Sequence, residues 1–324
     1  IRAPGAAYRV SREFEMIDQL IKEMELRGDL DLPAARQLLD EVKAMVRAEM
    51  DFRDEAAKER AMLERVESRP WYARLLTARP YIPRPHPVLV SEDFMVEEFV
   101  TTRRFADLPS WSPFGPSKRS IARAAVDEGM FGLVFDEWLE PDPHTGNRHA
   151  RWGGLYRFFS RLVVMDLGQG APHPIERLKP LMRAALALQA GDVPAAAQRL
   201  YAIANRDVKQ EEAKVLESLA KGIALRPEAG LIERLMDGLL EAEKLGVLVK
   251  PEYAALEKAM ILYTGYSDYL PKDYILHSLE RATVARLMRD GKLSAWGAVK
   301  LWFTRLFLGS AATRAELERL IEAL

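Results

Sequence analysis

Two short polar motifs, separated by a predicted β-hairpin, constrain the fold of this chain more than any other feature. The first is Asp142-Pro143-His144-Thr145-Gly146-Asn147, and the second is Asp166-Leu167-Gly168, which ends an apolar run from Leu162 to Met165. Each motif alone is weak, because Pro, Gly and Asn also build ordinary turns. Their order, their spacing and the strand that leads into Asp166 favour a fold that brings both loops into one cleft.

These residue types suit phosphoryl transfer, in which a protein mainly positions the reactants and neutralises charge. Asp142 would orient a substrate hydroxyl and could accept its proton. Asn147 and Asp166 would hold Mg²⁺, a hard cation that prefers oxygen ligands. The alternative that the first motif is simply a turn remains open on these residues alone. His144 and His149 have no HExxH-type helical pair beside them, so we expect a structural role for His144 within the loop rather than a zinc site.

The composition is that of an ordinary globular protein large enough to form two lobes. The chain has 324 residues, 48% of them hydrophobic, and a formal net charge of −1. Such a balance gives no general attraction to nucleic acid, so we expect no nucleic-acid partner. The absence of cysteine excludes disulfides, thiolate catalysis and cysteine-type zinc sites, and it fits a cytoplasmic location.

Periodicity and turn signals predict an α+β arrangement. Helices are expected over residues 11–27, from about Pro33 to Val66 as one long helix or as two with a bend near Met50-Asp51, and over 117–139 with Ser117 as the cap. One hairpin joins Val88–Val90 to Phe94–Val96, and a second turns at Trp152-Gly153-Gly154 and returns over Leu155–Met165. From Pro174 onward the chain is expected to be helical, with breaks at Gly191-Asp192, Arg226-Pro227, Gly246–Pro251, Leu270-Pro271 and Gly309-Ser310.

Two further features each have an ordinary and a functional interpretation. The acidic segment from Glu49 to Glu55 is either a solvated helix face or carries the glutamate that pairs with a phosphate-binding lysine, a role we assign to Glu49. Glu49 and Glu55 are six positions apart, so they project from different sides of a helix. The aromatic stripe within 296–308 is either core or a surface for peripheral membrane contact.

The ordered set of motifs resembles the UbiB-type atypical kinase family, kinase-like proteins associated with ubiquinone biosynthesis. The segment Glu49-Met50-Asp51-Phe52-Arg53-Asp54-Glu55-Ala56 is similar to the family's Glu-x-Asp-Tyr/Phe-x-x-Glu-Ala helix. Residues 140–147 match the family's His-Ala-Asp-Pro-His-Pro-Gly-Asn at five of eight positions, and Asp166-Leu167-Gly168 stands for Asp-Phe-Gly. The resemblance also includes Arg2-Ala3-Pro4-Gly5 and Val88 to Val100, and it extends to about Leu276.

The resemblance implies a protein-kinase-like fold that binds ATP with Mg²⁺ and transfers or hydrolyses the γ-phosphate, with a link to quinone or lipid metabolism. Asp142 becomes the catalytic residue, and Asn147 and Asp166 become the metal ligands. Glu49 and Glu55 become the acidic residues of the phosphate-binding half, while Glu97, Glu98, Phe99 and Val100 become the hinge beside the adenine. We expect an incomplete N-lobe over 1–100, a mostly helical C-lobe over 101–245 and a helical extension over 246–324.

Departures from the family pattern leave alternatives. Glu140, Thr145 and Leu167 replace the family's His, Pro and Phe, and none of these changes removes a metal ligand. The family's nucleotide loop and strand lysine would precede Ile1, so we expect an N-terminally truncated form that is inactive alone, with a lipid-type or small-molecule substrate and with membrane association left open. The alternatives are a small-molecule phosphotransferase of the aminoglycoside or choline kinase type and an inactive pseudokinase scaffold.

Overall fold

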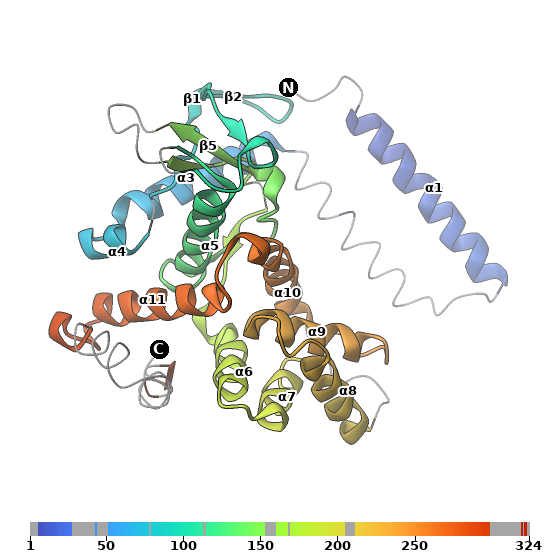
Figure 1. Ribbon diagram of the computed structural model, residues 1–324. Coiled ribbons are helices and arrows are strands. Elements are labelled where there is room, and N and C mark those ends of the chain that lie inside the picture. The colour runs from blue at the N-terminus through green and yellow to red at the C-terminus, as the bar shows by residue number, and fades with distance from the viewer. Residues whose placement is uncertain are drawn as a thin grey trace. The chain divides into compact units, whose positions relative to one another are not determined.

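The structure is a computed structural model in which the chain divides into two compact units, each considered by itself. It describes residues 6–27, 43, 51–77, 79–112, 115–152, 160–167, 169–204, 211–298, 319 and 321–322. The first unit comprises residues 1–64, 82–100 and 166–169, and the second comprises 65–81, 101–165 and 170–324. Helices and strands are labelled in Figure 1.

Within the described residues, the first unit contains two helices and a hairpin. Helix α1 spans Ala6–Arg27, and helix α3 spans Phe52–Ser68. The last residues of α3, from Arg65 onward, belong to the second unit. Strand β1 (Pro85–Val90) pairs antiparallel with β2 (Met95–Glu97). The hydroxyl of Ser91 accepts hydrogen bonds from the backbone N–H groups of Asp93 and Phe94, which closes the turn. The predicted hairpin and the predicted helix over 11–27 are thus confirmed.

The helix predicted from Pro33 to Val66 is described only in part. Residues 28–42 and 44–50, which include Glu49, lie outside the described residues. The described portion starts at Asp51, whose carboxylate accepts hydrogen bonds from the backbone N–H and the guanidinium of Arg53. Helix α3 follows from Phe52, next to the position at which the sequence predicts a bend.

The second unit contains two small antiparallel sheets. The three-stranded sheet has the order β3-β5-β6, formed by Arg103–Arg104, Arg148–Trp152 and Ser160–Val164. The two-stranded sheet pairs β4 (Trp138–Leu139) with β7 (Ala171–Pro172). The predicted second hairpin is confirmed as β5 and β6. Residues 153–159, which include the two glycines of the predicted turn and the start of the predicted return strand, lie outside the described residues. Short helices complete this part of the unit: α4 (Trp71–Leu76), η1 (Phe105–Asp107), η2 (Thr145–Asn147) and η3 (Ile175–Arg177).

Helix α5 (Lys118–Val134) forms the core of the second unit, where it packs against β6 and against α11 (Tyr274–Arg289). Ser117 caps it as predicted, because its hydroxyl accepts a hydrogen bond from the N–H of Ser120 while the Ser120 hydroxyl accepts one from the N–H of Ser117. The predicted end at residue 139 is wrong. Glu137 has a left-handed φ of 53°, which a continuing helix cannot accommodate, and the next two residues form β4.

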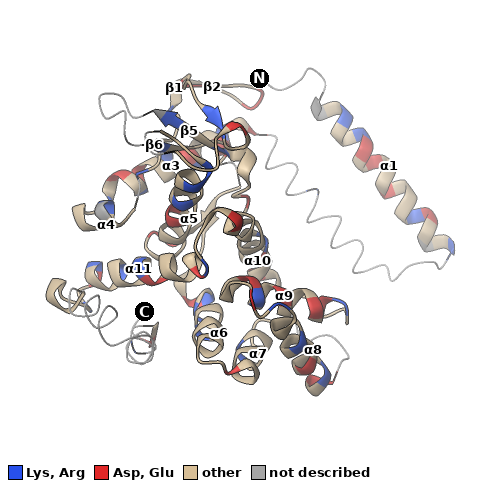
Figure 2. Ribbon diagram, viewed as in Figure 1, with Lys and Arg blue, Asp and Glu red and all other residues tan. Residues whose placement is uncertain are grey.

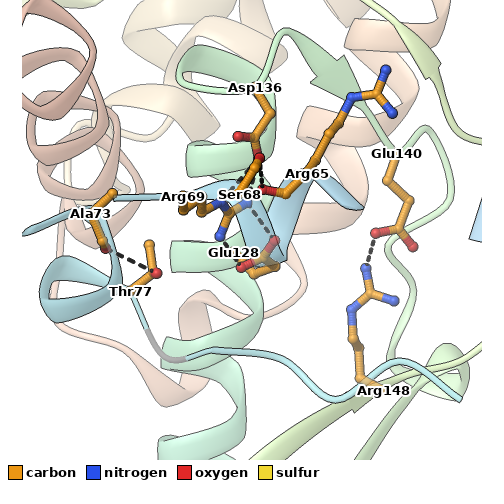
Figure 3. Close-up of polar contacts among 9 residues, drawn as sticks. All are labelled: Arg65, Ser68, Arg69, Ala73, Thr77, Glu128, Asp136, Glu140 and Arg148. Carbon is orange, nitrogen blue, oxygen red and sulfur yellow. Dashed lines mark hydrogen bonds and ion pairs between the residues drawn. The ribbon is translucent and has the colours of Figure 1, made fainter. Parts of the chain in front are cut away.

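A buried ion cluster joins the segment after α3 to α5 within the second unit (Figure 3). The Arg69 guanidinium is 1% exposed and donates to the carboxylates of Glu128, at 2.7 Å, and Asp136, at 2.5 Å. Burial of these carboxylates is tolerable because the planar guanidinium satisfies both of them at once. Arg69 therefore fixes residues 65–77 on the central helix.

From Lys179 onward, the described part of the second unit is mainly helical. The helices are α6 (Lys179–Gln189), α7 (Val193–Tyr201), α8 (Glu212–Leu225), α9 (Leu231–Glu243), α10 (Pro251–Thr264), η4 (Ser267–Tyr269) and α11. The predicted breaks are confirmed except the one at 309–310, which lies outside the described residues, as does most of the aromatic stripe. Across the described residues, every helix is too short or too polar to cross a bilayer.

Candidate functional site

The loop that carries Asp142 is anchored at both ends by a buried ion pair. Glu140 follows β4, and Arg148 begins β5, so the pair closes the loop between them. Figure 3 shows the contact between Glu140 and Arg148. The two side chains are 9% and 2% exposed, and Arg148 also donates to the carbonyl of Asn147 at 3.3 Å. Glu140 is where the sequence departs from the family's His, and its ion pair gives that departure a structural role.

The middle of the loop is held from the helical block of the same unit. The hydroxyl of Tyr266, which is fully buried, donates to the carbonyl of Pro143 at 2.8 Å. Burial raises the pKa of Tyr266, so the phenol stays protonated and remains a donor. Asp142, the residue before Pro143, lies 3.8 Å from the ammonium of Lys258 on α10. Its side chain is 27% exposed, so it is anchored yet accessible.

His144 and His149 both make hydrogen bonds to the backbone of Gly146 in the loop. The Nδ1 atom of His144 accepts a hydrogen bond from the N–H of Gly146 at 3.0 Å, which confirms the predicted structural role. Because a carbonyl can only accept, the Nε2 atom of His149 donates to Gly146, and its Nδ1 atom can then accept from the hydroxyl of Thr102. Within the described part of the chain, no group of three or more His, Asp or Glu side chains forms a metal cluster.

Asn147 is placed by the β5–β6 ladder. It is 9% exposed, and within the described residues its side chain has no hydrogen-bond partner, with Nδ2 fully buried. The carbonyl of Asn147 accepts from the N–H of Met165 at 3.0 Å. Asp166 follows in the chain and adopts a left-handed φ of 56°. A non-glycine residue in this conformation costs free energy, which is a feature found at functional sites.

A group of acidic side chains lies around Asp166 within the first unit. Burial, together with smaller contributions from the carboxylates of Glu97, Glu55 and Asp166, raises the pKa of Glu59 to about 8. Burial also raises the pKa of Glu55, with smaller contributions from Asp166 and Glu97. Glu59 was not singled out from the sequence. The spacing of four residues from Glu55 could have identified it, because such residues share a helix face.

The other predicted binding residues are less constrained. Glu97 ends β2 and is exposed, and the N–H of Glu98 donates to the carbonyl of Arg84 at 2.9 Å. Phe99 is 91% exposed, and Val100 is partly buried. Nothing in these contacts tests an adenine-binding role, so that role stays a prediction, as does the role of Glu49.

Comparison with known proteins gives the family. A family model described as the ABC1 atypical kinase-like domain matches residues 1–200, more than half of the chain. No curated protein matches the chain. Among solved structures, the chain is similar to a protein from Mycobacterium tuberculosis, Rv3197, in complex with erythromycin, with 15% identity, a TM-score of 0.47 and coverage of 85% of this chain and 71% of that one. The predicted membership of a UbiB-type family is confirmed by the first of these matches, and the chain belongs to the ABC1 atypical kinase-like family.

Proposed function

We propose that this protein is an atypical kinase or ATPase that binds Mg-ATP and transfers or hydrolyses the γ-phosphate. The observation that carries the proposal is the anchoring of the loop with Asp142 and Asn147. An ion pair closes the loop, a buried tyrosine holds its middle, and a backbone hydrogen bond ties Asn147 to the residue before Asp166. A flexible turn would need none of these supports. Phosphoryl transfer depends on such fixed positions.

Asp142 is the proposed catalytic residue. Its carboxylate would accept a hydrogen bond from the attacking hydroxyl or water and take up the proton as the new phosphorus–oxygen bond forms and the bond from the γ-phosphorus to the ADP oxygen breaks, with ADP as the leaving group. The ammonium of Lys258 lies 3.8 Å from this carboxylate and gives it a partner of opposite charge. The partial exposure of Asp142 leaves room for a substrate oxygen.

Asn147 and Asp166 are the proposed magnesium ligands, and each is considered within its own unit. The amide of Asn147 is nearly buried without a hydrogen-bond partner among the described residues, so it has an unused polar group. Its oxygen and nitrogen positions can be exchanged by an amide flip, which turns an oxygen toward a cation. Asp166 offers an exposed carboxylate. When bound, Mg²⁺ would neutralise the phosphate charge.

Glu49 keeps the proposed role of ion-pair partner to a phosphate-binding lysine, and the second acidic residue of that proposal is Glu55. Burial and the nearby carboxylates of Asp166 and Glu97 disfavour its ionised form, so a cation beside it would relieve that cost. The roles of Glu49 and of residues 97–100 at the nucleotide, and the boundaries at residues 100 and 245, belong to the same proposal. A quinone-related, lipid-type or other small molecule is the proposed substrate, and membrane contact through 296–308 is part of that proposal.

ATP turnover by the full-length gene product tests the proposal. We expect Asp142→Asn to reduce turnover at least about 100-fold, because the loss of a general base costs this much. Asp107→Asn is the control, since it removes an exposed carboxylate that forms a surface ion pair with Arg104. Equal turnover in the wild type and Asp142→Asn would refute the catalytic role and favour a scaffold without phosphotransfer.

A further inference from the structure

Two arginines face each other across the β5–β6 hairpin of the second unit. Arg151 on β5 is the direct partner of Arg161 on β6 in the antiparallel register. Directly opposed residues on antiparallel strands have Cβ atoms about 5 Å apart, and like charges at such positions destabilise the pair. Both strands are seen in Figure 2, which colours Lys and Arg blue. The two guanidinium groups therefore repel each other, and this repulsion does not help to form the hairpin.

Tyr81 organises both guanidinium groups. Its backbone extends the hairpin edge, because its N–H donates to the carbonyl of Leu162 at 2.7 Å and its carbonyl accepts from the N–H of Val164 at 2.9 Å. The guanidinium carbon of Arg151 lies 4.6 Å from the centre of the Tyr81 ring, and that of Arg161 lies 5.0 Å from it. Stacking of this kind restricts a guanidinium while leaving its N–H edge available for a ligand.

Arg161 is further fixed by the segment before Tyr81. Its guanidinium donates to the carbonyl of Arg79 at 3.3 Å and to that of Pro80 at 3.4 Å. These bonds hold the group in place without neutralising its charge. The side chain of Arg79 adds a third positive charge, which reaches the carboxylate of Glu67 at 3.5 Å.

Among the described residues, no carboxylate balances Arg151 or Arg161. Among the described residues, neither forms an ion pair, and residues 148–165 include no Asp or Glu in the sequence. Burial lowers the pKa of Arg161, and the positive charges of Arg79 and Arg151 lower it further. Two guanidinium groups of like charge are thus held together by an aromatic ring and two carbonyls, and neither has a carboxylate partner in the described part of the chain.

We propose that Arg151 and Arg161, stacked on Tyr81 and assisted by Arg79, form a binding site for a phosphate-type oxyanion. Arginine suits this ligand because its planar fork donates two parallel hydrogen bonds to phosphate oxygens. A bound phosphate would also remove the cross-strand repulsion. The phosphate could belong to a free anion or to the headgroup of an anionic phospholipid. This site shares no residue with those proposed for Mg-ATP, so it stands independently of the catalytic proposal.

The test uses the full-length protein and two probes. The first is inorganic phosphate, compared with chloride at equal ionic strength, with the shift in Tm as the readout. The second is sedimentation with vesicles of phosphatidylcholine alone or mixed with phosphatidylglycerol. The variants are R151Q/R161Q and the single R151Q, whose side chain makes no hydrogen bond in the described part of the chain. The matched control is R103Q/R104Q, which removes two charges from exposed positions on β3 of the same sheet.

We expect a phosphate-dependent rise in Tm, binding to the anionic vesicles, or both, in the wild type and in R103Q/R104Q. R151Q/R161Q should lose the effect, and R151Q should lose most of it. Response to phosphate alone identifies a free anion as the ligand, and response to anionic vesicles alone identifies a headgroup. Equal responses in R151Q/R161Q and the control, or no response of the wild type to either probe, overturn the proposal. The same responses should persist in D166N, which separates this site from the proposed Mg-ATP residues.

Discussion

The ion pair between Glu140 and Arg148 permits a prediction that joins stability to the placement of Asp142. Both side chains are nearly inaccessible, so Glu140→Gln leaves a buried guanidinium without its counter-charge. Loss of one partner of a buried pair costs about 3–5 kcal/mol. For a unit of this size, that corresponds to a fall in Tm of roughly 6–20 °C. Arg148→Met should cost a similar amount, because it strands the carboxylate instead.

The double variant distinguishes this reasoning from simple loss of packing. In the pair, one carboxylate oxygen of Glu140 and the Nε atom of Arg148 are buried without partners among the described residues, so the pair is incompletely satisfied. Replacement of both charges, in E140Q/R148M, should therefore cost much less than the sum of the single changes, to within about 1–2 kcal/mol of the wild type.

Urea unfolding of the wild type, both single variants and the double variant completes the cycle. D107N serves as the control, since its exposed pair with Arg104 should change stability little. The reasoning is refuted if E140Q costs less than about 1 kcal/mol or if the two single costs add in the double variant. Additivity would mean that the two side chains do not interact, and the anchoring of the loop would then need another explanation.

Two further predictions concern the carboxyl of Glu59 and the hydroxyl of Tyr266. The pKa of Glu59 is raised to about 8 in the folded state, against an ordinary value of 4.5. The folded state therefore favours the protonated carboxyl, and this contribution to the free energy of unfolding is fully present below pH 4.5 and is lost as the pH rises to 8. Glu59→Gln should therefore raise the free energy of unfolding by about 4 kcal/mol at pH 8 and hardly at pH 4, and equal urea midpoints at pH 8 would contradict this. Tyr266→Phe removes the donor to Pro143 and should cost about 1–3 kcal/mol in urea unfolding. It should also lower ATP turnover, and unchanged turnover with lost stability would separate the tyrosine from catalysis.

The sequence predicts best where a local rule decides the structure. Ser117 caps α5 because its hydroxyl is the local acceptor for a free N–H group at the start of the helix. The hairpin of β5 and β6 is predicted from the Gly153-Gly154 turn signal and from the apolar run that ends at Met165. The end of α5 was misplaced, since Trp138 and Leu139 are apolar and continue the helical pattern. Their pairing with β7 depends on residues more than thirty positions away, which no local rule reveals.

In the candidate site, too, some features could be predicted from local sequence and others depend on distant residues. Asp142, Asn147 and Asp166 could be recognised because their types and order are distinctive. The partners that hold the loop come from distant parts of the chain, as with Tyr266, which is 123 positions from Pro143. Glu59 is likewise buried by tertiary packing, which its position in the sequence does not reveal. Residue identity thus predicted the proposed chemistry, whereas the means of positioning it required the fold.

Magnesium-dependent binding of ATP tests the central claim most directly. We would measure the Tm of the full-length gene product with ATP, with and without Mg²⁺, in the wild type, in D166N and in D93N, which changes an exposed carboxylate in the turn between β1 and β2 of the same unit. At a ligand concentration of about 100 times Kd, binding should stabilise the wild type and D93N by roughly 2.7 kcal/mol. We predict that D166N loses this magnesium-dependent stabilisation. An equal shift in D166N and the wild type would contradict the assignment of Asp166 as a metal ligand and, with it, the proposed Mg-ATP site.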